Sequence, residues 1–310
     1  MAAMKKCQEI DYVRSVLMAI VILVHIVNFG NLYPMFKQSM FTFFMPAFLI
    51  ITGYLVNIEK TVGEFLKYLL RIVLPYVIMV TAFSVLSVFL PVRDGLTELS
   101  FTAVAERVFV KSIGPYWFFY DMIVCGTVYY AAFRLFPSLS KASRLALFAF
   151  SLYLLAFFVP LLTPADATLF FIGAVLRQYE VSFLKAFPAS VFSLLPFLVL
   201  ILQPELWHKW ICLVLPFFAV SFLVWCHGKT PERLREVMNY CGRNTLPVYI
   251  FHPVFTMMSK FYLPVFAFDS SGIIHAMVTI AIGFAGSILM AKTLDRTGLS
   301  RVFGVVKLLR

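Results

Sequence analysis

The sequence predicts an all-α, polytopic membrane protein with about ten transmembrane helices around a polar central cavity. First, 62% of its 310 residues are hydrophobic, 13% are charged, and the mean hydropathy is +0.91. Ordinary soluble domains hold about 25% charged residues, so this composition excludes them. Second, long apolar runs recur along the chain between short polar loops. Third, ionisable side chains fall inside some of these runs, and such groups face the protein interior or water rather than lipid.

Each predicted span is an apolar run close to the length of about 20 residues that crosses the hydrocarbon core. The runs cover residues 12–29, 39–57, 70–90, 115–135, 144–162, 165–178, 183–202, 209–227, 244–267 and 273–292. The run at 165–178 is short for a full crossing, so we expect it to be tilted or partly inserted. Prolines in the seventh to ninth runs are tolerated where neighbouring helices satisfy the backbone. We expect a single transmembrane domain over residues 1–310.

The distribution of basic residues predicts the orientation. Most of the 26 lysines and arginines fall in loops on one side, and cytoplasmic loops carry such an excess. Both termini are therefore expected in the cytoplasm, with the chain in the inner membrane of the cell. The net charge of +11 is then a topology signal, and the lack of a separate basic domain argues against nucleic-acid binding.

The start of the chain and its cysteines carry two further expectations. The first apolar run lacks a small-residue cleavage site, so we expect it to stay as a span instead of being removed as a signal peptide. The five cysteines show no metal-ligand spacing. We therefore predict no metal site.

The run at 12–29 holds the most informative residues. Eleven residues turn a helix by about 1100°, roughly 20° beyond three full turns, so Arg14 and His25 share one face about 16 Å apart. Asp11 can pair with Arg14, and Asn28 lies close to the same stripe. A lone membrane histidine can be only a helix contact, and an arginine near a helix end can simply reach the interface. Their shared face favours a functional role.

Four other features are candidates for function. Lys67 and Arg71 share a helix face at a predicted cytoplasmic entrance, which suits phosphates and equally suits a positive-inside anchor. The aromatic segment containing Trp117 suits an interfacial belt or a stacking floor for a sugar. Asp121 lies about two turns into its span and needs a partner, and His252 is a second histidine inside a span.

The second run, at 39–57, contains Met45-Pro46 and Gly53. Proline and glycine in one span predict a kink and a close approach between helices. Plain helix packing explains these residues equally well when they are taken alone.

In their order along the chain, these motifs resemble the integral-membrane acyltransferase-3 family, and within it the sugar O-acetyltransferases similar to fucose 4-O-acetylases. The resemblance rests on Asp11, Arg14 and His25, on Phe43–Tyr54, on Arg71 with Leu74-Pro75-Tyr76, on Trp117-Phe118, and on Gly242–Leu246 through Tyr249 and His252. Two positions depart from the family pattern. Phe44 stands where many relatives have a histidine, and Thr245 replaces a serine, so the acceptor sugar is left open.

The resemblance implies about ten spans in one acyltransferase domain, a cytoplasmic acyl-CoA donor and an acceptor at the outer face. The expected enzyme is a membrane-bound O-acyltransferase that moves an acyl group, acetyl from acetyl-CoA, to a hydroxyl of an extracytoplasmic glycan or sugar of the cell envelope. Its expected catalytic residues are His25 as the base, Arg14 and Asp11. The residues expected to bind acyl-CoA are Arg14, Lys67, Arg71 and Tyr76, and those expected to bind the acceptor are Asn28, Trp117, Asp121 and His252.

Two other functions stay open. One is a transporter or flippase that moves a glycan or small solute through the same polar core, and the other is a non-catalytic membrane subunit. Coupled ion sites usually need carboxylates within the membrane. Asp121 is the only deep one in the sequence, which counts against a proton-driven carrier.

Overall fold

The computed structural model of the chain describes residues 7–89, 95–207 and 209–310. Within these residues every regular element is helical and there is no strand, so the all-α prediction is confirmed. Residue 90, at the end of the third predicted span, and residues 91–94 of the loop after it lie outside the described residues.

The chain divides into two compact units, which we describe separately. The first unit comprises Met1–Phe48, Glu180–Thr297 and Lys307–Arg310, and the second comprises Leu49–Tyr179 and Gly298–Val306. The first unit contains α1 (Gln8–His25), α2 (Val27–Leu32), α3 (Pro34–Phe41), α10 (Phe183–Ala186), α11 (Leu194–Ile201), α12 (Leu215–Lys229), α13 (Glu232–Arg243), α14 (Thr245–Tyr262) and α15 (Ile273–Thr297). The second contains α5 (Val62–Phe89), α6 (Phe101–Phe109), α7 (Trp117–Arg134), α8 (Lys141–Phe158) and α9 (Pro164–Gln178), while α4 (Phe44–Leu55) runs from the first unit into the second. That the whole chain acts as one domain stays a prediction.

Among the described residues, four helical stretches are long and apolar enough to cross a membrane. They are Pro34–Leu55, which joins α3 and α4, Val62–Phe89, Lys141–Phe158 and Ile273–Thr297. The ten predicted spans and the polar central cavity are therefore not confirmed. Several predicted spans are short or interrupted: α9 and α12 have 15 residues each, about 22 Å of helix against a core of about 30 Å. The run at 183–202 is divided between α10, a 3₁₀ turn and α11.

In the first unit, α1 is the central helix and packs against α12, α13, α14 and α15. Gly242 of α13 allows the closest approach, because a Cβ there would lie 1.7 Å from the main-chain oxygen of Asp11. Helix α1 ends at His25, since Ile26 is extended with φ −75° and ψ 109°, and α2 begins at Val27. The prediction of one continuous helix over 12–29 is therefore wrong, and the break follows the histidine directly.

In the second unit, two glycines let α4 and α9 cross in contact. A Cβ on Gly53 would lie 2.1 Å from the main-chain oxygen of Phe170, and a Cβ on Gly173 would lie 2.0 Å from that of Ile50. The close helix approach predicted for Gly53 is confirmed. Pro46 lies in the first turn of α4, where a proline needs no break.

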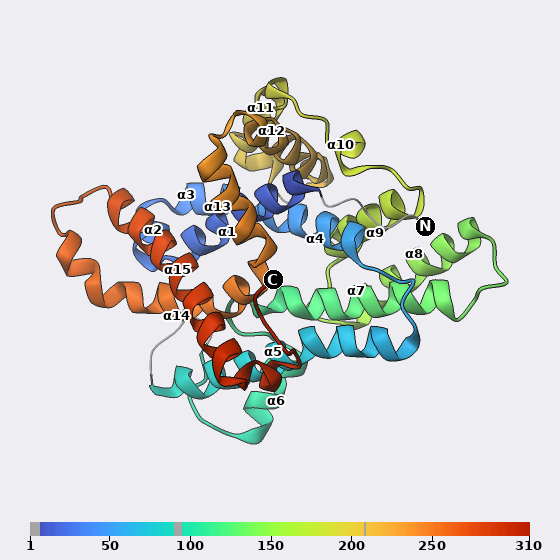
Figure 1. The fold of residues 1–310 in the computed structure, drawn as a ribbon, viewed down its shortest axis with the longest axis horizontal. Coiled ribbons are helices and arrows are strands. Elements are labelled where there is room, and N and C mark those ends of the chain that lie inside the picture. Colours follow the sequence, from blue (N-terminus) through green and yellow to red (C-terminus); the bar gives the residue numbers. More distant parts are fainter. Residues whose placement is uncertain (1–6, 90–94, 208) are drawn as a thin grey trace. The chain divides into compact units, whose positions relative to one another are not determined.

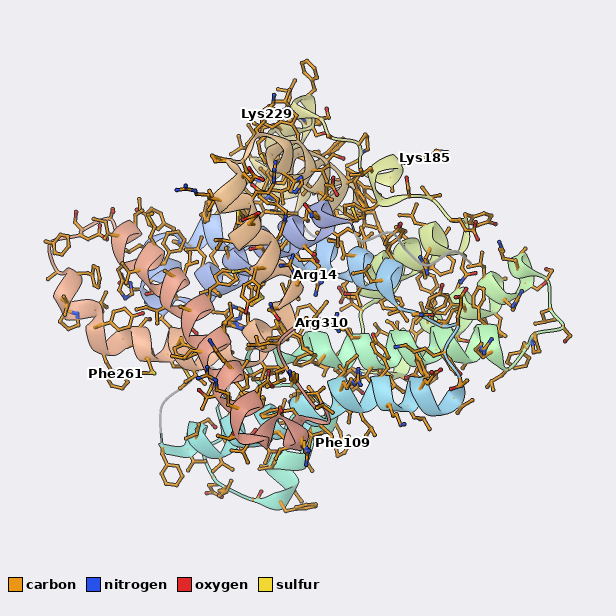
Figure 2. The ribbon with its side chains drawn as sticks, in the orientation of Figure 1. Arg14, Phe109, Lys185, Lys229, Phe261 and Arg310 are labelled. Carbon is orange, nitrogen blue, oxygen red and sulfur yellow. The ribbon has the colours of Figure 1, made fainter. Side chains whose placement is uncertain are left out.

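Many apolar side chains remain exposed on these helices. Phe261 of α14, labelled in Figure 2, is 79% exposed, and Phe157 and Phe158 of α8 are comparably open. A soluble monomer rarely exposes so many large apolar groups. Such surfaces are typical of helices that face lipid.

Candidate functional site

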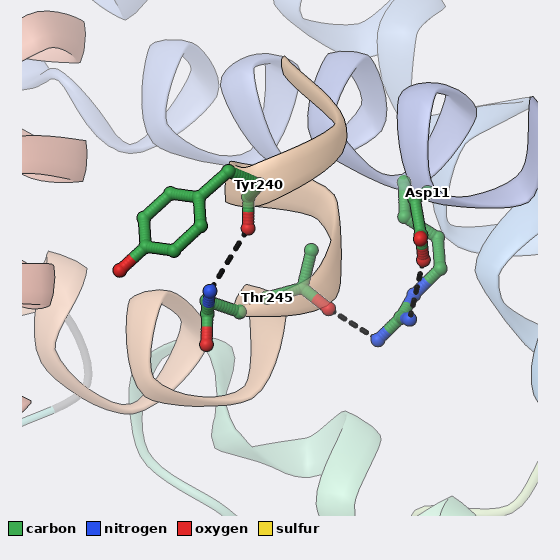
Figure 3. A network of polar contacts seen from close by, with 5 residues as sticks. Asp11, Tyr240 and Thr245 are labelled. Atoms are coloured by element: carbon green, nitrogen blue, oxygen red, sulfur yellow. Dashed lines mark hydrogen bonds and ion pairs between the residues drawn. The ribbon is translucent and has the colours of Figure 1, made fainter. Parts of the chain in front are cut away.

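Arg14 lies at the centre of a polar network in the first unit (Figure 3). Its Nη2 donates a hydrogen bond to Oγ1 of Thr245, the first residue of α14. Its Nη1 lies 3.9 Å from Oδ1 of Asp11, so the predicted pairing of Asp11 with Arg14 is present. The guanidinium is therefore held from both sides. The Arg14 side chain is 22% exposed.

The junction between α13 and α14 carries the second half of this network. The side-chain amide of Asn244 is fully buried and donates from Nδ2 to the main-chain oxygen of Tyr240 at 2.9 Å. Its Oδ1 accepts the main-chain N–H of Arg310 at 2.8 Å. Arg310 is thereby brought close enough to Arg14 for the two positive charges to repel each other (Figure 2). Such a concentration of positive charge suits an anionic ligand.

His25 and His252 meet with their rings in an edge-to-face arrangement. The ring centroids are 5.5 Å apart and the planes are inclined by 72°. Nδ1 of His25 lies 2.6 Å from the main-chain oxygen of Val21. Because a carbonyl oxygen can only accept, Nδ1 carries the proton, and Nε2 of the neutral ring holds a free lone pair.

His252 has the same tautomer, because its Nδ1 lies 3.1 Å from the oxygen of Val248 and 3.0 Å from that of Tyr249. Its ring is fully buried, and Nε2 has no hydrogen-bond partner among the described residues. An unpartnered buried acceptor is costly. The pair therefore combines a partly exposed ring, that of His25, with a buried ring whose acceptor nitrogen is unused.

The two chain segments that form this site run parallel. Gly242 contacts Asp11 and Thr245 contacts Arg14, in each case 231 residues later, and His252 contacts His25. The charged network and the histidine pair thus follow each other along α1 in the predicted order. Sequence reasoning gave no role to Gly242, Thr245 or Asn244, although all three stand in the late motif that was compared with the family.

The thiols near the start of α1 and on α13 are unsuited to act as nucleophiles. Burial, together with a hydrogen bond from the Cys7 thiol to Glu9 at 3.1 Å, raises the pKa of Cys7 to about 11. Burial also raises the pKa of Cys241. Both groups stay protonated at neutral pH, whereas a nucleophilic cysteine needs its thiolate form. The oxygen and nitrogen groups of the site are thus the chemically relevant ones.

The remaining acceptor candidate of the first unit, Asn28, lies on α2 beyond the break at Ile26. It does not continue the straight face that joins Arg14 to His25. Its Nδ2 would lie 3.1 Å from a Cβ on Gly272, in the connection before α15. Asn28 therefore faces the turn between α14 and α15.

The other predicted site residues lie in the second unit. Lys67 and Arg71 are both exposed on α5, which fits a pair that holds phosphates and equally fits a positive-inside anchor. Tyr76 of the same helix is buried, and its hydroxyl donates to the main-chain oxygen of Val108 at 2.7 Å. That hydroxyl is already used within the unit.

Trp117 begins α7, and Asp121 lies one turn later. Asp121 is fully buried, and neither of its carboxylate oxygens has a hydrogen-bond partner among the described residues. The expectation that this carboxyl needs a partner is not met within the second unit. An uncompensated buried carboxylate is costly, so it takes up a proton or binds a group from outside.

No curated protein and no solved structure matches the chain. A family model described as an acyltransferase domain matches residues 8–292, which include both histidines and the Arg14 network. The chain therefore belongs to the acyltransferase-3 family and is a membrane acyltransferase.

Proposed function

We propose that the chain is an acyl-CoA-dependent O-acyltransferase of the inner membrane, similar to the sugar O-acetylases of the fucose 4-O-acetylase kind. It moves an acetyl group from cytoplasmic acetyl-CoA to a hydroxyl of an extracytoplasmic sugar or glycan. The observation that carries the proposal is the position of the His25 ring, whose Nδ1 lies 2.6 Å from the main-chain oxygen of Val21. Its Nδ1–H is bound to Val21, so Nε2 can accept a proton from a hydroxyl.

The reaction needs one proton transfer and one exchange of bonds. Nε2 of His25 takes the proton of the acceptor hydroxyl while the oxygen attacks the thioester carbonyl carbon. The new C–O bond forms, the C–S bond breaks, and the proton returns from His25 to the CoA thiolate. Histidine suits both directions, because its unperturbed pKa of about 6.5 lies near neutrality.

Arg14 and His252 have supporting parts in this proposal. Arg14, fixed by Asp11 and Thr245, binds a phosphate of the donor through its planar fork. His252 accepts a hydrogen bond from the sugar through its unpartnered Nε2, and Asn28 contributes to the same acceptor side. Lys67, Arg71, Tyr76, Trp117 and Asp121 stay predictions made from the sequence.

The test is incubation of the purified protein in lipid nanodiscs with acetyl-CoA labelled in the acetyl group and a panel of glycans. We expect label to appear on a glycan hydroxyl as an acetyl ester, which mild base hydrolyses to labelled acetate. Movement of a glycan across the bilayer with no ester formed would favour the transporter or flippase instead. If no labelled glycan and no labelled acetate form, and no glycan is transported, the result would favour a non-catalytic subunit.

A further inference from the structure

The surface between α1 and α13 contains a polar pocket of about 430 Å³. Its lining consists only of polar side chains, namely Gln8, Glu232, Arg235, Glu236, Asn239 and Arg243. The residues from α13 recur at helical spacing and so form one face of that helix. All of its residues belong to the first unit.

Two features of the lining favour a ligand that carries both phosphate and hydrogen-bond donors. Arg235 and Arg243 are half-buried, and neither forms an ion pair with a carboxylate among the described residues. Guanidinium groups bind phosphate oxygens in pairs of hydrogen bonds. Asn239 is 4% exposed, and its Oδ1 has no hydrogen-bond partner among the described residues. That oxygen can only accept, so it needs an N–H or O–H from the ligand.

The two glutamates of the lining restrict further which chemical groups the ligand can carry. Glu232 and Glu236 would repel a bare anion, but they can accept hydrogen bonds from hydroxyl or amino groups. A nucleoside phosphate offers phosphate oxygens to the arginines, and hydroxyl and amino groups to Asn239 and the glutamates. Inorganic phosphate offers no ribose hydroxyl and no amino group. A phospholipid would need an apolar wall for its chains, and none of the lining residues supplies one.

The position of the pocket along α1 matches the shape of the donor. Gln8 precedes Arg14 by six residues, about 9 Å of helix, and precedes His25 by about 25 Å. The chain between the nucleoside and the sulfur of CoA has roughly 17 bonds and reaches about 20 Å when extended, at about 1.2 Å a bond. A donor whose thioester lies at His25 therefore places its nucleotide near the far end of α1.

We infer that the pocket between α1 and α13 binds the adenosine bisphosphate portion of the acyl-CoA donor. Arg235 and Arg243 bind its phosphates, and Asn239 accepts a hydrogen bond from its amino group or a ribose hydroxyl. This inference rests on the proposed function for the identity of the donor. It adds α13 to the donor site, for which the sequence indicated only Arg14, Lys67, Arg71 and Tyr76.

The test measures binding of adenosine 3′,5′-bisphosphate to the full-length protein in nanodiscs by calorimetry. Arg243→Gln and Arg235→Gln should each weaken binding about tenfold or more, the usual loss for a hydrogen bond to a charged group. Arg233→Gln is the matched control, since Arg233 is exposed on α13 and does not line the pocket. Asn239→Leu should weaken the bisphosphate more than it weakens pyrophosphate. Unfolding temperatures close to the wild-type value show that the variants are folded.

The outcomes separate this inference from the proposed function. Equal binding by wild type, Arg243→Gln and Arg235→Gln, or no binding by a wild type that acetylates a glycan, would overturn the pocket assignment alone. If the bisphosphate binds through both arginines but the protein transfers no acetyl group, the pocket assignment is supported and the proposed function is contradicted. Displacement of the bisphosphate by anionic phosphatidylglycerol but not by CoA would assign the pocket to a lipid headgroup and contradict the inference.

Discussion

Thr245 follows Arg14 by 231 residues, yet its hydroxyl accepts a hydrogen bond from the Arg14 guanidinium. The bond joins the start of α14 to α1 and leaves the Asp11 side of the guanidinium to an ion pair. Thr245, which replaces a serine of the family pattern, thus belongs to the polar network around Arg14. The hydroxyl that threonine shares with serine is the group that the geometry uses.

This relationship predicts a graded loss of donor binding. Arg14→Lys keeps the charge but loses the planar fork, so acyl-CoA binding should weaken by about 1.5–3 kcal/mol. Thr245→Val keeps the shape and removes the acceptor, and the loss should be smaller, about 0.5–1.5 kcal/mol. Calorimetry with CoA measures both, and Thr293→Val on the exposed part of α15 is the control. Unchanged CoA affinity in Arg14→Lys would show that Arg14 forms no bidentate contact with CoA.

The contact between Gly242 and Asp11 predicts a stability effect. In Gly242→Ala the new Cβ would lie 1.7 Å from a main-chain oxygen, so α1 and α13 must separate, at a cost of about 1–3 kcal/mol or more. Gly228→Ala on α12 is the matched control, because nothing lies within 4 Å of its Cβ. It should be neutral or stabilising by up to about 1 kcal/mol. Thermal unfolding in detergent compares the two, and equal midpoints would contradict the close packing.

The stability of the protein should depend on pH through Asp269, which lies before the N-terminus of α15. Asp269 accepts hydrogen bonds from the Ser271 hydroxyl and from the main-chain N–H groups of Ile274 and His275. These bonds lower the pKa of Asp269 from its ordinary value. A lowered pKa means that the stabilisation is complete above the unfolded-state value of about 3.9 and is lost as the pH falls through the folded-state value.

Unfolding midpoints of wild type and Asp269→Ala should therefore differ at pH 6 and converge below about pH 4. Asp295→Ala is a useful comparison, since Asp295 accepts from Leu308 and Leu309 at the other end of α15. A difference for Asp269→Ala that stays constant down to pH 3 would show that the carboxylate charge is not involved.

The orientation predicted from basic residues is testable by labelling. In a variant without the native cysteines, a membrane-impermeant maleimide added to intact cells should modify Glu98→Cys and spare Arg233→Cys. Both side chains are exposed in the structure, so access to the thiol is not limited by the fold. Permeabilised cells should label both. The reverse pattern in intact cells would put the donor on the wrong side of the membrane.

The helical class, the pairing of Asp11 with Arg14 and the close approach at Gly53 were predictable because each depends on local spacing or on residue size. The break after His25 was not, since the chain is helical on both sides of the single extended residue Ile26 and the apolar pattern continues across it. The length of an apolar run was also a poor guide to helix length. Residues 183–202 are apolar almost throughout, but they form two short α-helices and a 3₁₀ turn. The contacts of His252 and Thr245 with α1 join residues more than two hundred positions apart, and hydrophobic periodicity carries no information on such pairs.

The central claim is that His25 is the catalytic base, and the most direct test is the rate of acetyl transfer by His25→Ala. The variant should fold, because the half-buried ring lies at the end of α1, and it should bind CoA, whose phosphates lie about three turns away. Transfer to a glycan at saturating acetyl-CoA should fall by a factor on the order of 10²–10⁴, as expected when a positioned base is removed. A folded His25→Ala protein with near-normal transfer would contradict the account, and His252 would then be the next base to test.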